Sequence, residues 1–100
     1  MLKIKDGIDL ATLKDFGFKF EEQNHDEYKG REYVARVFVR DFGNTTCEVV
    51  ESRTGFEWIW PNDPREIYFY PNDYELFIDR EELDLIYDLI SAGIVQKVEE

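Results

Sequence analysis

Hydrophobic and polar positions alternate most clearly in residues 32–40, EYVARVFVR. Alternation with a period of two is typical of a half-buried β-strand. One face of this strand carries Tyr33, Ala35, Val37 and Val39, and the other carries Val34, Arg36, Phe38 and Arg40. A second strand is expected at residues 45–51, TTCEVVE. The short DFGN connection between the two leaves room only for antiparallel pairing.

Shorter segments on both sides of this pair also have strand or loop character. In residues 18–22, FKFEE, Phe18 and Phe20 fall on one face, and residues 24–30, NHDEYKG, have the composition of a loop. Further along, turn-forming residues separate three apolar runs: FEWIW at 56–60, EIYFY at 66–70 and YELFI at 74–78. Runs spaced in this way predict a meander of antiparallel strands.

The strongest helical pattern lies near the end of the chain. Asp79 and Glu82 have the spacing of a capping box, which begins a helix. The apolar residues that follow recur at helical spacing and predict a core-facing stripe of Leu83, Ile86, Tyr87 and Ile90, widened by Leu85 and Leu89. Gly93 is expected to end the helix, and IVQKV is expected to return as a strand.

A shorter helix is expected near the start of the chain. Asp9 can cap it, Leu10 and Leu13 face the same way, and Gly17 suits the left-handed conformation that closes a helix. Together the elements predict a single α+β domain over residues 1–100. In this domain an antiparallel meander sheet of about five or six strands packs on the C-terminal helix and the short N-terminal helix.

Composition and charge narrow the class of partner. The chain is 43% hydrophobic and has a net charge of −11, and residues 61–100 hold 11 acidic and 3 basic residues. Such a chain does not grip nucleic-acid phosphates or an anionic membrane surface, because both tasks need a basic face. We therefore expect a protein partner with a basic surface, no direct nucleic-acid contact and no membrane association.

Candidate catalytic groups are sparse. His25 is the lone histidine and lies in the expected loop, and Cys47 lies in an expected strand, where a small buried side chain is the usual outcome. The sequence has no phosphate-binding loop and no zinc-ligand spacing, so we expect a non-enzymatic protein without a cofactor. A single cysteine and the lack of an apolar leader segment indicate a cytoplasmic location.

Residues 58–73 contain one pattern twice, two aromatics around an apolar residue followed by Pro-Asn-Asp. The two Pro-Asn-Asp units favour chain reversals, and the alternative is a cation site at Asp63 and Asp73. In an extended strand Trp58 and Trp60 share one side, as do Tyr68 and Tyr70. These four rings either build the core or form a partner platform, and the sequence leaves both interpretations open.

Acidic residues are concentrated in the C-terminal region, as Asp73, Glu75, Asp79, Glu81, Glu82, Asp84 and Asp88. One interpretation is a solvated helix face whose first turn complements the helix dipole. The other is a surface that imitates nucleic-acid phosphates and binds a basic protein groove. The sequence does not decide between them.

The two ends of the chain, MLKIKDGIDLATLKDFGFKF and LDLIYDLISAGIVQKVEE, resemble small acidic orphan proteins encoded by phages and prophages of Gram-positive bacteria. The resemblance implies a cytoplasmic accessory protein, and it transfers no functional residue. Our leading hypothesis is a non-enzymatic protein that binds a host or phage protein through Trp58, Trp60, Tyr68, Tyr70, Asp73, Glu75, Glu81, Asp84 and Asp88. The alternatives are a small carboxylate-based, metal-dependent hydrolase and a structural homodimer.

Overall fold

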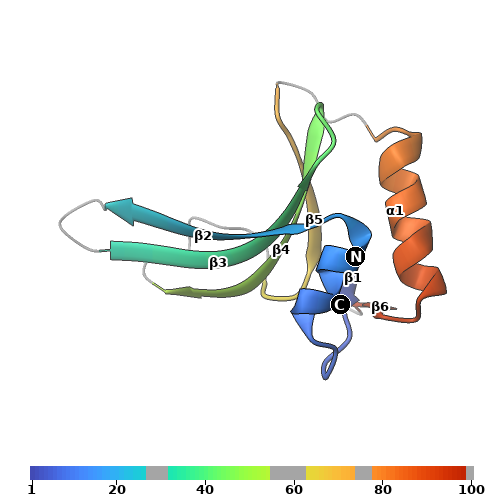
Figure 1. The fold of residues 1–100 in the computed structure, drawn as a ribbon, viewed down its shortest axis with the longest axis horizontal. Helices are drawn as coiled ribbons and strands as arrows, with labels where there is room; N and C mark the ends of the chain where they lie inside the picture. Colours follow the sequence, from blue (N-terminus) through green and yellow to red (C-terminus); the bar gives the residue numbers. More distant parts are fainter. Residues whose placement is uncertain (27–31, 55–62, 74–77, 99–100) are drawn as a thin grey trace.

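The computed structural model describes residues 1–26, 32–54, 63–73 and 78–98 of the chain. It contains both helix and antiparallel sheet, which confirms the predicted α+β class (Figure 1). The elements in chain order are β1 (Leu2–Ile4), the 3-10 helix η1 (Leu10–Phe16), β2 (Lys19–Asp26), β3 (Glu32–Asp41), β4 (Thr45–Thr54), β5 (Ile67–Pro71), α1 (Arg80–Ser91) and β6 (Val95–Lys97).

The larger sheet has four strands in the order β2-β3-β4-β5, and every neighbouring pair is antiparallel. The predicted pairing of residues 32–40 with residues 45–51 is confirmed, with Val37 opposite Val50 and Phe38 opposite Val49. The register shifts between Arg36 and Val37, which marks a bulge in this pair. The expected EIYFY strand is also present, as β5 on the far side of β4.

A second sheet joins the two ends of the chain, and it departs from the single sheet that was predicted. β1 pairs with β6, so that Leu2 lies opposite Lys97 and Ile4 opposite Val95. The return of IVQKV as a strand is confirmed, but its partner is the first strand of the chain rather than the meander. An isolated bridge between Lys3 and Glu66 connects this small sheet to the turn that precedes β5.

Two predictions about local structure change or remain open. Residues 24–26 were expected in a loop but belong to β2, because β3 begins at Glu32 and supplies backbone partners as far as Asp26. Composition marks turn residues but does not reveal how far the ladder of a hairpin continues into them. The predicted strand FEWIW at 56–60 and residues 74–77 of YELFI lie outside the described residues.

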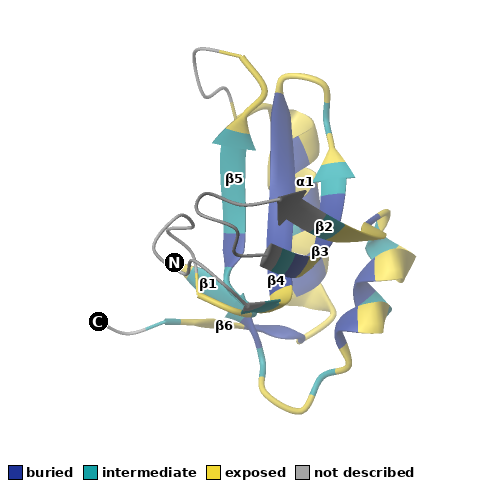
Figure 2. Ribbon diagram, turned by 90° about the vertical axis from the view of Figure 1, so that its left-hand side faces the viewer, coloured by how far each residue is buried: buried dark blue, intermediate teal, exposed yellow. Residues whose placement is uncertain are grey.

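The alternation of side chains in β3 and β4 produces two buried clusters on opposite faces of the sheet. The larger cluster combines sheet residues such as Phe38 and Val49 with η1, α1 and the small sheet. The smaller cluster, on the other face, consists of Ala35, Val37, Val39 and Val50. Figure 2 shows the result, since β4 is buried along most of its length between the two clusters.

Both helices begin and end as the sequence predicted. The Asp9 carboxylate accepts a hydrogen bond from Ala11 N at 2.9 Å, and Gly17 closes η1 with φ of 86°. Asp79 and Glu82 form the expected capping box at the start of α1, and Gly93 follows its end with φ of 72°. In the part of the chain that is described, neither helix is long and apolar enough to cross a membrane.

Candidate functional site

The exposed side of α1 is the surface that departs most from expectation. The sequence predicted that Leu83, Tyr87 and Ile90 face the core, but these side chains are 56%, 69% and 53% exposed. The buried side of the helix consists of Glu82, Leu85 and Leu89 instead. Leu85 and Leu89, which were expected at the border of the stripe, are buried, and Ile86 is half-buried. The helix is therefore rotated about its axis relative to the predicted packing.

Glu82 explains the rotation of α1. Its Oε1 accepts a hydrogen bond from the Thr45 hydroxyl at 2.6 Å, and its Oε2 accepts one from Asp79 N at 2.8 Å. A carboxylate is buried at low cost only when its oxygens are hydrogen-bonded in this way. The hydrogen bond from Thr45 also holds the pKa of Glu82 below its ordinary value, against the opposing effect of burial. Glu82 can therefore face the sheet as a charged group.

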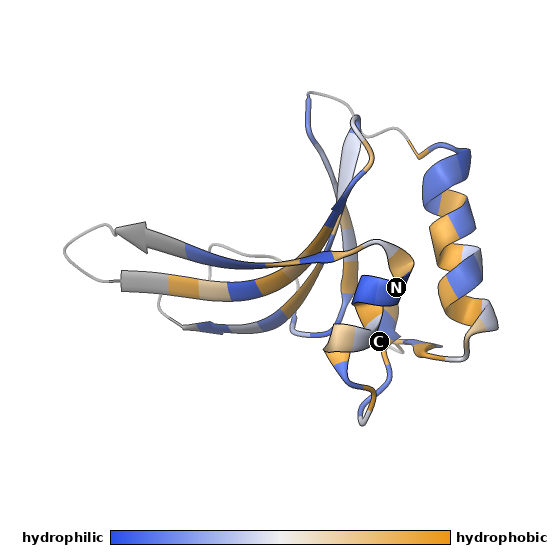
Figure 3. Cartoon of the chain, in the orientation of Figure 1, coloured by the Kyte–Doolittle hydropathy of each residue, from blue (hydrophilic) through white to orange (hydrophobic). Residues whose placement is uncertain are grey.

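The rotation leaves an apolar stripe on the surface, and we call Leu83, Tyr87 and Ile90 the outer face of α1. Residues at spacings of three and four lie on one side of a helix, so the three side chains form a continuous row. Figure 3 shows hydrophobic residues at intervals along the helix among hydrophilic ones. Ile78, which is 41% exposed, precedes the helix and adds to the apolar surface near its first turn.

Acidic side chains follow the same helix on its other exposed side, and we call Glu81, Asp84 and Asp88 the acidic edge. All three are exposed. Each residue of a helix turns the chain by about 100°, so the acidic edge lies roughly 120° around the axis from the outer face and on the same solvent-facing half. A partner that covers the outer face therefore meets an acidic border.

The structure divides the nine predicted partner-binding residues among different places. Glu81, Asp84 and Asp88 lie together on α1, and Asp73 is exposed just beyond the end of β5. Tyr68 and Tyr70 lie opposite Glu48 and Thr46 on β4. None of these residues belongs to the larger cluster, so the two tyrosines lie on the sheet face that points away from α1. The remaining three, Trp58, Trp60 and Glu75, lie outside the described residues.

Tyr68 and Tyr70 are neither core nor open platform. Both are half-buried, and their ring centroids lie 6.2 Å apart with the planes tilted by 30°. Burial is the main cause that raises the pKa of Tyr70, and the nearby carboxylate of Glu48 adds to it. The pair packs along the edge strand of the sheet in a way that stabilises the sheet itself.

Glu48 is a buried residue whose importance the sequence did not reveal. It lies between Val39 and Tyr68 on the neighbouring strands, and only 3% of it is exposed. Burial raises the pKa of its carboxyl, and repulsion from Glu21 raises it further. The alternation of TTCEVVE puts Glu48 on the same face as Val50, which favours burial of Glu48. Acidic residues are so common in this chain that one more in a strand does not stand out.

The second Pro-Asn-Asp unit ends a strand, as predicted. Pro71 is the last residue of β5, and the Asn72 side chain donates to Gly43 O at 2.9 Å and to Asp41 at 3.1 Å. Its amide oxygen accepts from the Thr46 hydroxyl at 2.7 Å. Asn72 thus fastens β5 to the β3–β4 hairpin. Of the first unit, only Asp63 is described.

Metal and nucleophile chemistry receive no support from the described residues. Among them, no group of three or more His, Cys, Asp or Glu side chains is placed to hold a metal ion. Asp63 begins a turn in which Glu66 N donates to Asp63 O at 3.2 Å, and its carboxylate lies 3.9 Å from the Arg53 guanidinium. Burial raises the pKa of the Cys47 thiol to about 12, so it stays protonated and unreactive near neutral pH.

The outer face of α1 and its acidic edge bring three exposed apolar side chains and three exposed carboxylates onto one helix. Comparison of the chain with models of protein families, with curated proteins and with solved structures finds no match in any of the three.

Proposed function

We propose that this chain is a non-enzymatic binding protein whose α1 docks on a protein partner. The partner would present an apolar patch bordered by Lys or Arg. The observation that carries the proposal is the exposure of Leu83, Tyr87 and Ile90 in one row beside Glu81, Asp84 and Asp88. The phage origin that the resemblance implies remains a prediction.

The apolar row supplies the affinity in this proposal. Full burial of one such side chain is worth about 1.5–3 kcal/mol, and each of these three side chains is more than half exposed in the free chain. Contiguous apolar residues with a polar border are typical of protein interaction sites rather than of inert surface. Tyr87 is the most exposed of the three, and tyrosine is enriched among residues that dominate binding energy.

The acidic charge of the chain determines which class of partner it favours. The chain carries a net charge of −11, and the acidic edge concentrates three carboxylates beside the apolar row. Complementary charges accelerate association and disfavour acidic partners. A protein groove that normally binds nucleic acid has the required basic rim, so the nucleic-acid-mimicking form of the hypothesis is one version of this proposal.

A homodimer through α1 is the weaker alternative. A symmetric pairing of two outer faces would bring two acidic edges close together, and like charges that face each other oppose association. Sedimentation equilibrium distinguishes the two cases. A dimer that forms at micromolar concentration and dissociates in Tyr87→Ser would favour the homodimer and overturn the proposal.

The decisive experiment selects binders without assuming a partner. A library of random displayed peptides is enriched on the immobilised chain, and the enriched peptides are synthesised and titrated by fluorescence anisotropy. We expect sequences that combine apolar residues at helical spacing with Lys or Arg. Tyr87→Ser and Asp84→Lys should each weaken binding, the former by at least about tenfold if Tyr87 dominates the contact.

Asp15→Lys is the matched control for Asp84→Lys. Both aspartates are exposed, and the two substitutions change the net charge equally, but Asp15 lies in η1 rather than on α1. Equal loss of binding in the two variants would mean that only the overall charge matters, and the proposal would fail. Binding that is unchanged between about 0.05 M and about 0.5 M salt would remove the electrostatic part, including nucleic-acid mimicry.

A further inference from the structure

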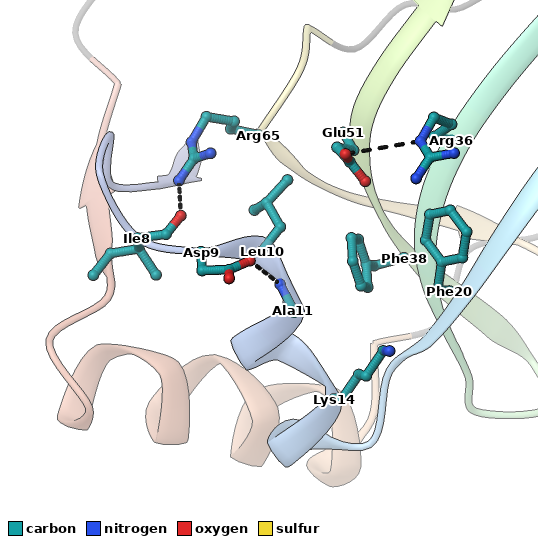
Figure 4. Close-up of a pocket in the computed structure, with 10 residues that line it drawn as sticks. All are labelled: Ile8, Asp9, Leu10, Ala11, Lys14, Phe20, Arg36, Phe38, Glu51 and Arg65. Atoms are coloured by element: carbon teal, nitrogen blue, oxygen red, sulfur yellow. Dashed lines mark hydrogen bonds and ion pairs between the residues drawn. The ribbon is translucent and has the colours of Figure 1, made fainter.

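An open pocket of about 470 Å³ lies between η1 and the four-stranded sheet, away from the outer face of α1. Its walls come from five parts of the chain: the segment before η1, η1 itself, β2 with β3, β4, and the turn before β5. Figure 4 shows Leu10 and Phe38 on opposite sides of the space, with Lys14 reaching in from the helix. The volume lies within the range of small-molecule sites.

Two phenylalanines line one wall of the pocket, and of these Phe38 is almost fully buried. Phe20 and Phe38 meet edge to face with ring centroids 5.4 Å apart, and Phe20 is 36% exposed. The Arg36 guanidinium lies 4.8 Å from the centre of the Phe20 ring. The Arg36 side chain is held there by Glu22 at 3.1 Å and by Glu51 at 3.8 Å. The wall is thus built before any ligand enters, and it offers planar surface.

The charged side chains that line the pocket, three basic and two acidic, differ in how far their charges are already paired. One carboxylate oxygen of Asp9 accepts a hydrogen bond from Ala11 N, and Glu51 forms an ion pair with Arg36. Arg65 donates to the carbonyls of Ile4, Lys5 and Ile8, and its guanidinium lies 3.8 Å from the exposed carboxylate of Asp6. In the described residues, Lys14 has no hydrogen-bond or ion-pair partner. Its ammonium is therefore available to a ligand.

We propose that this pocket binds a small aromatic monocarboxylate. The ring lies against Phe20 and between Leu10 and Phe38, and the carboxylate accepts a charge-assisted hydrogen bond from Lys14. A monoanion fits better than a phosphate or a dianion, because Asp9 and Glu51 border the same space and repel additional negative charge. This binding activity is independent of the function proposed for α1.

The test uses 2-naphthoate as the probe and the full chain labelled with ¹⁵N. Titration followed by NMR should move the backbone amide signals of Ala11, Lys14, Phe20 and Arg36. The neutral analogue 2-naphthamide should bind at least about tenfold more weakly, since it cannot form the charge-assisted bond. Acetate, which keeps the charge and lacks the ring, should produce no saturable shifts in these signals.

Two variants and one control make the result decisive. Lys14→Gln should weaken naphthoate binding about tenfold, and Ala11→Phe should block the pocket while leaving every charge in place. Lys19→Gln is the control, because Lys19 is an exposed lysine adjacent to Phe20 that points to the other face of β2. It should bind naphthoate like the unchanged chain.

Several outcomes would overturn the inference. Equal affinity for naphthoate and naphthamide would remove the role of Lys14, as would equal binding by Lys14→Gln and Lys19→Gln. Signals that move only on α1 would place the probe elsewhere. Tyr87→Ser should leave naphthoate binding unchanged, so failure of this inference and failure of the function proposed for α1 are distinguished.

Discussion

The Thr45 hydroxyl donates a hydrogen bond of 2.6 Å to Glu82 Oε1 and thereby joins the start of β4 to the first turn of α1. Both side chains are almost fully buried, with Thr45 at 0% and Glu82 at 2% exposure. A polar contact in this position fixes which side of α1 faces the sheet. It also determines that Leu83, Tyr87 and Ile90 remain outside.

Replacing Glu82 by glutamine should destabilise the fold. The amide keeps one oxygen acceptor, but its NH₂ group cannot accept from either Thr45 or Asp79 N, so one buried donor loses its partner. The expected loss in the free energy of unfolding is about 1–3 kcal/mol. Urea denaturation measures it, with Glu81→Gln as the exposed neighbour that should change stability by less than about 0.5 kcal/mol. Equal effects in the two variants would contradict the buried contact.

The same carboxylate should make the fold sensitive to acid. Because the pKa of Glu82 is lower in the folded chain than its ordinary value of 4.5, the group contributes stability above that value. This contribution disappears as the pH falls from about the unfolded value through the lower folded one. Urea unfolding at several pH values should therefore show a smaller loss in acid for Glu82→Gln than for the unchanged chain. Parallel pH profiles would refute the assignment.

Glu82 also shows how far the sequence predicts this fold. Its capping box with Asp79 is a local pattern, and it was recognised correctly. Its hydrogen bond to Thr45 spans 37 positions, and no local pattern reveals such a partner. The predicted stripe is therefore centred on the wrong side of α1, since its border residues Leu85 and Leu89 are buried but its central residues are mostly exposed.

The two sheets illustrate the same limit. The alternation in residues 32–40 is long enough to predict both faces of β3. In contrast, β1 has only three residues, and it pairs with β6 from the opposite end of the chain. The acidic edge of α1 was predicted as a candidate site, but the outer face beside it became visible only once the rotation of the helix was known.

Glu48 should respond to pH in the opposite direction from Glu82. Burial raises its folded pKa above the ordinary value of 4.5, so this carboxyl favours folding below that value. The contribution is lost as the pH rises through the folded pKa, where the buried group must ionise. Glu48→Gln should therefore increase the free energy of unfolding at pH 7, and the gain should shrink toward pH 4. A glutamine variant that is less stable than the unchanged chain at pH 7 would contradict this prediction.

Arg65 should be the residue in the turn before β5 that tolerates change least. It has a positive φ of 74°, a conformation that strains a side chain with a Cβ, and its guanidinium donates to three carbonyls near the N-terminus. Arg65→Gly and Arg65→Ala both lose these bonds, but only glycine relieves the strain. Urea denaturation should find the alanine variant less stable than the glycine variant by about 1 kcal/mol. Equal stability of the two would mean that the turn relaxes when the arginine is removed.

Two leucines of α1, two positions apart, test the orientation of the helix directly. Leu85 is 1% exposed in the larger cluster, whereas Leu83 is 56% exposed on the outer face. Leu85→Ala should lower the free energy of unfolding by about 2–5 kcal/mol, because it leaves a cavity in the core. Leu83→Ala should change it by less than about 0.5 kcal/mol, since no packed neighbour is lost. The substitution is chemically identical in both cases, so differences in helix propensity cancel. If Leu83→Ala were the more damaging of the two, the helix would face the sheet with the stripe that the sequence first predicted, and the surface proposed for partner binding would be buried.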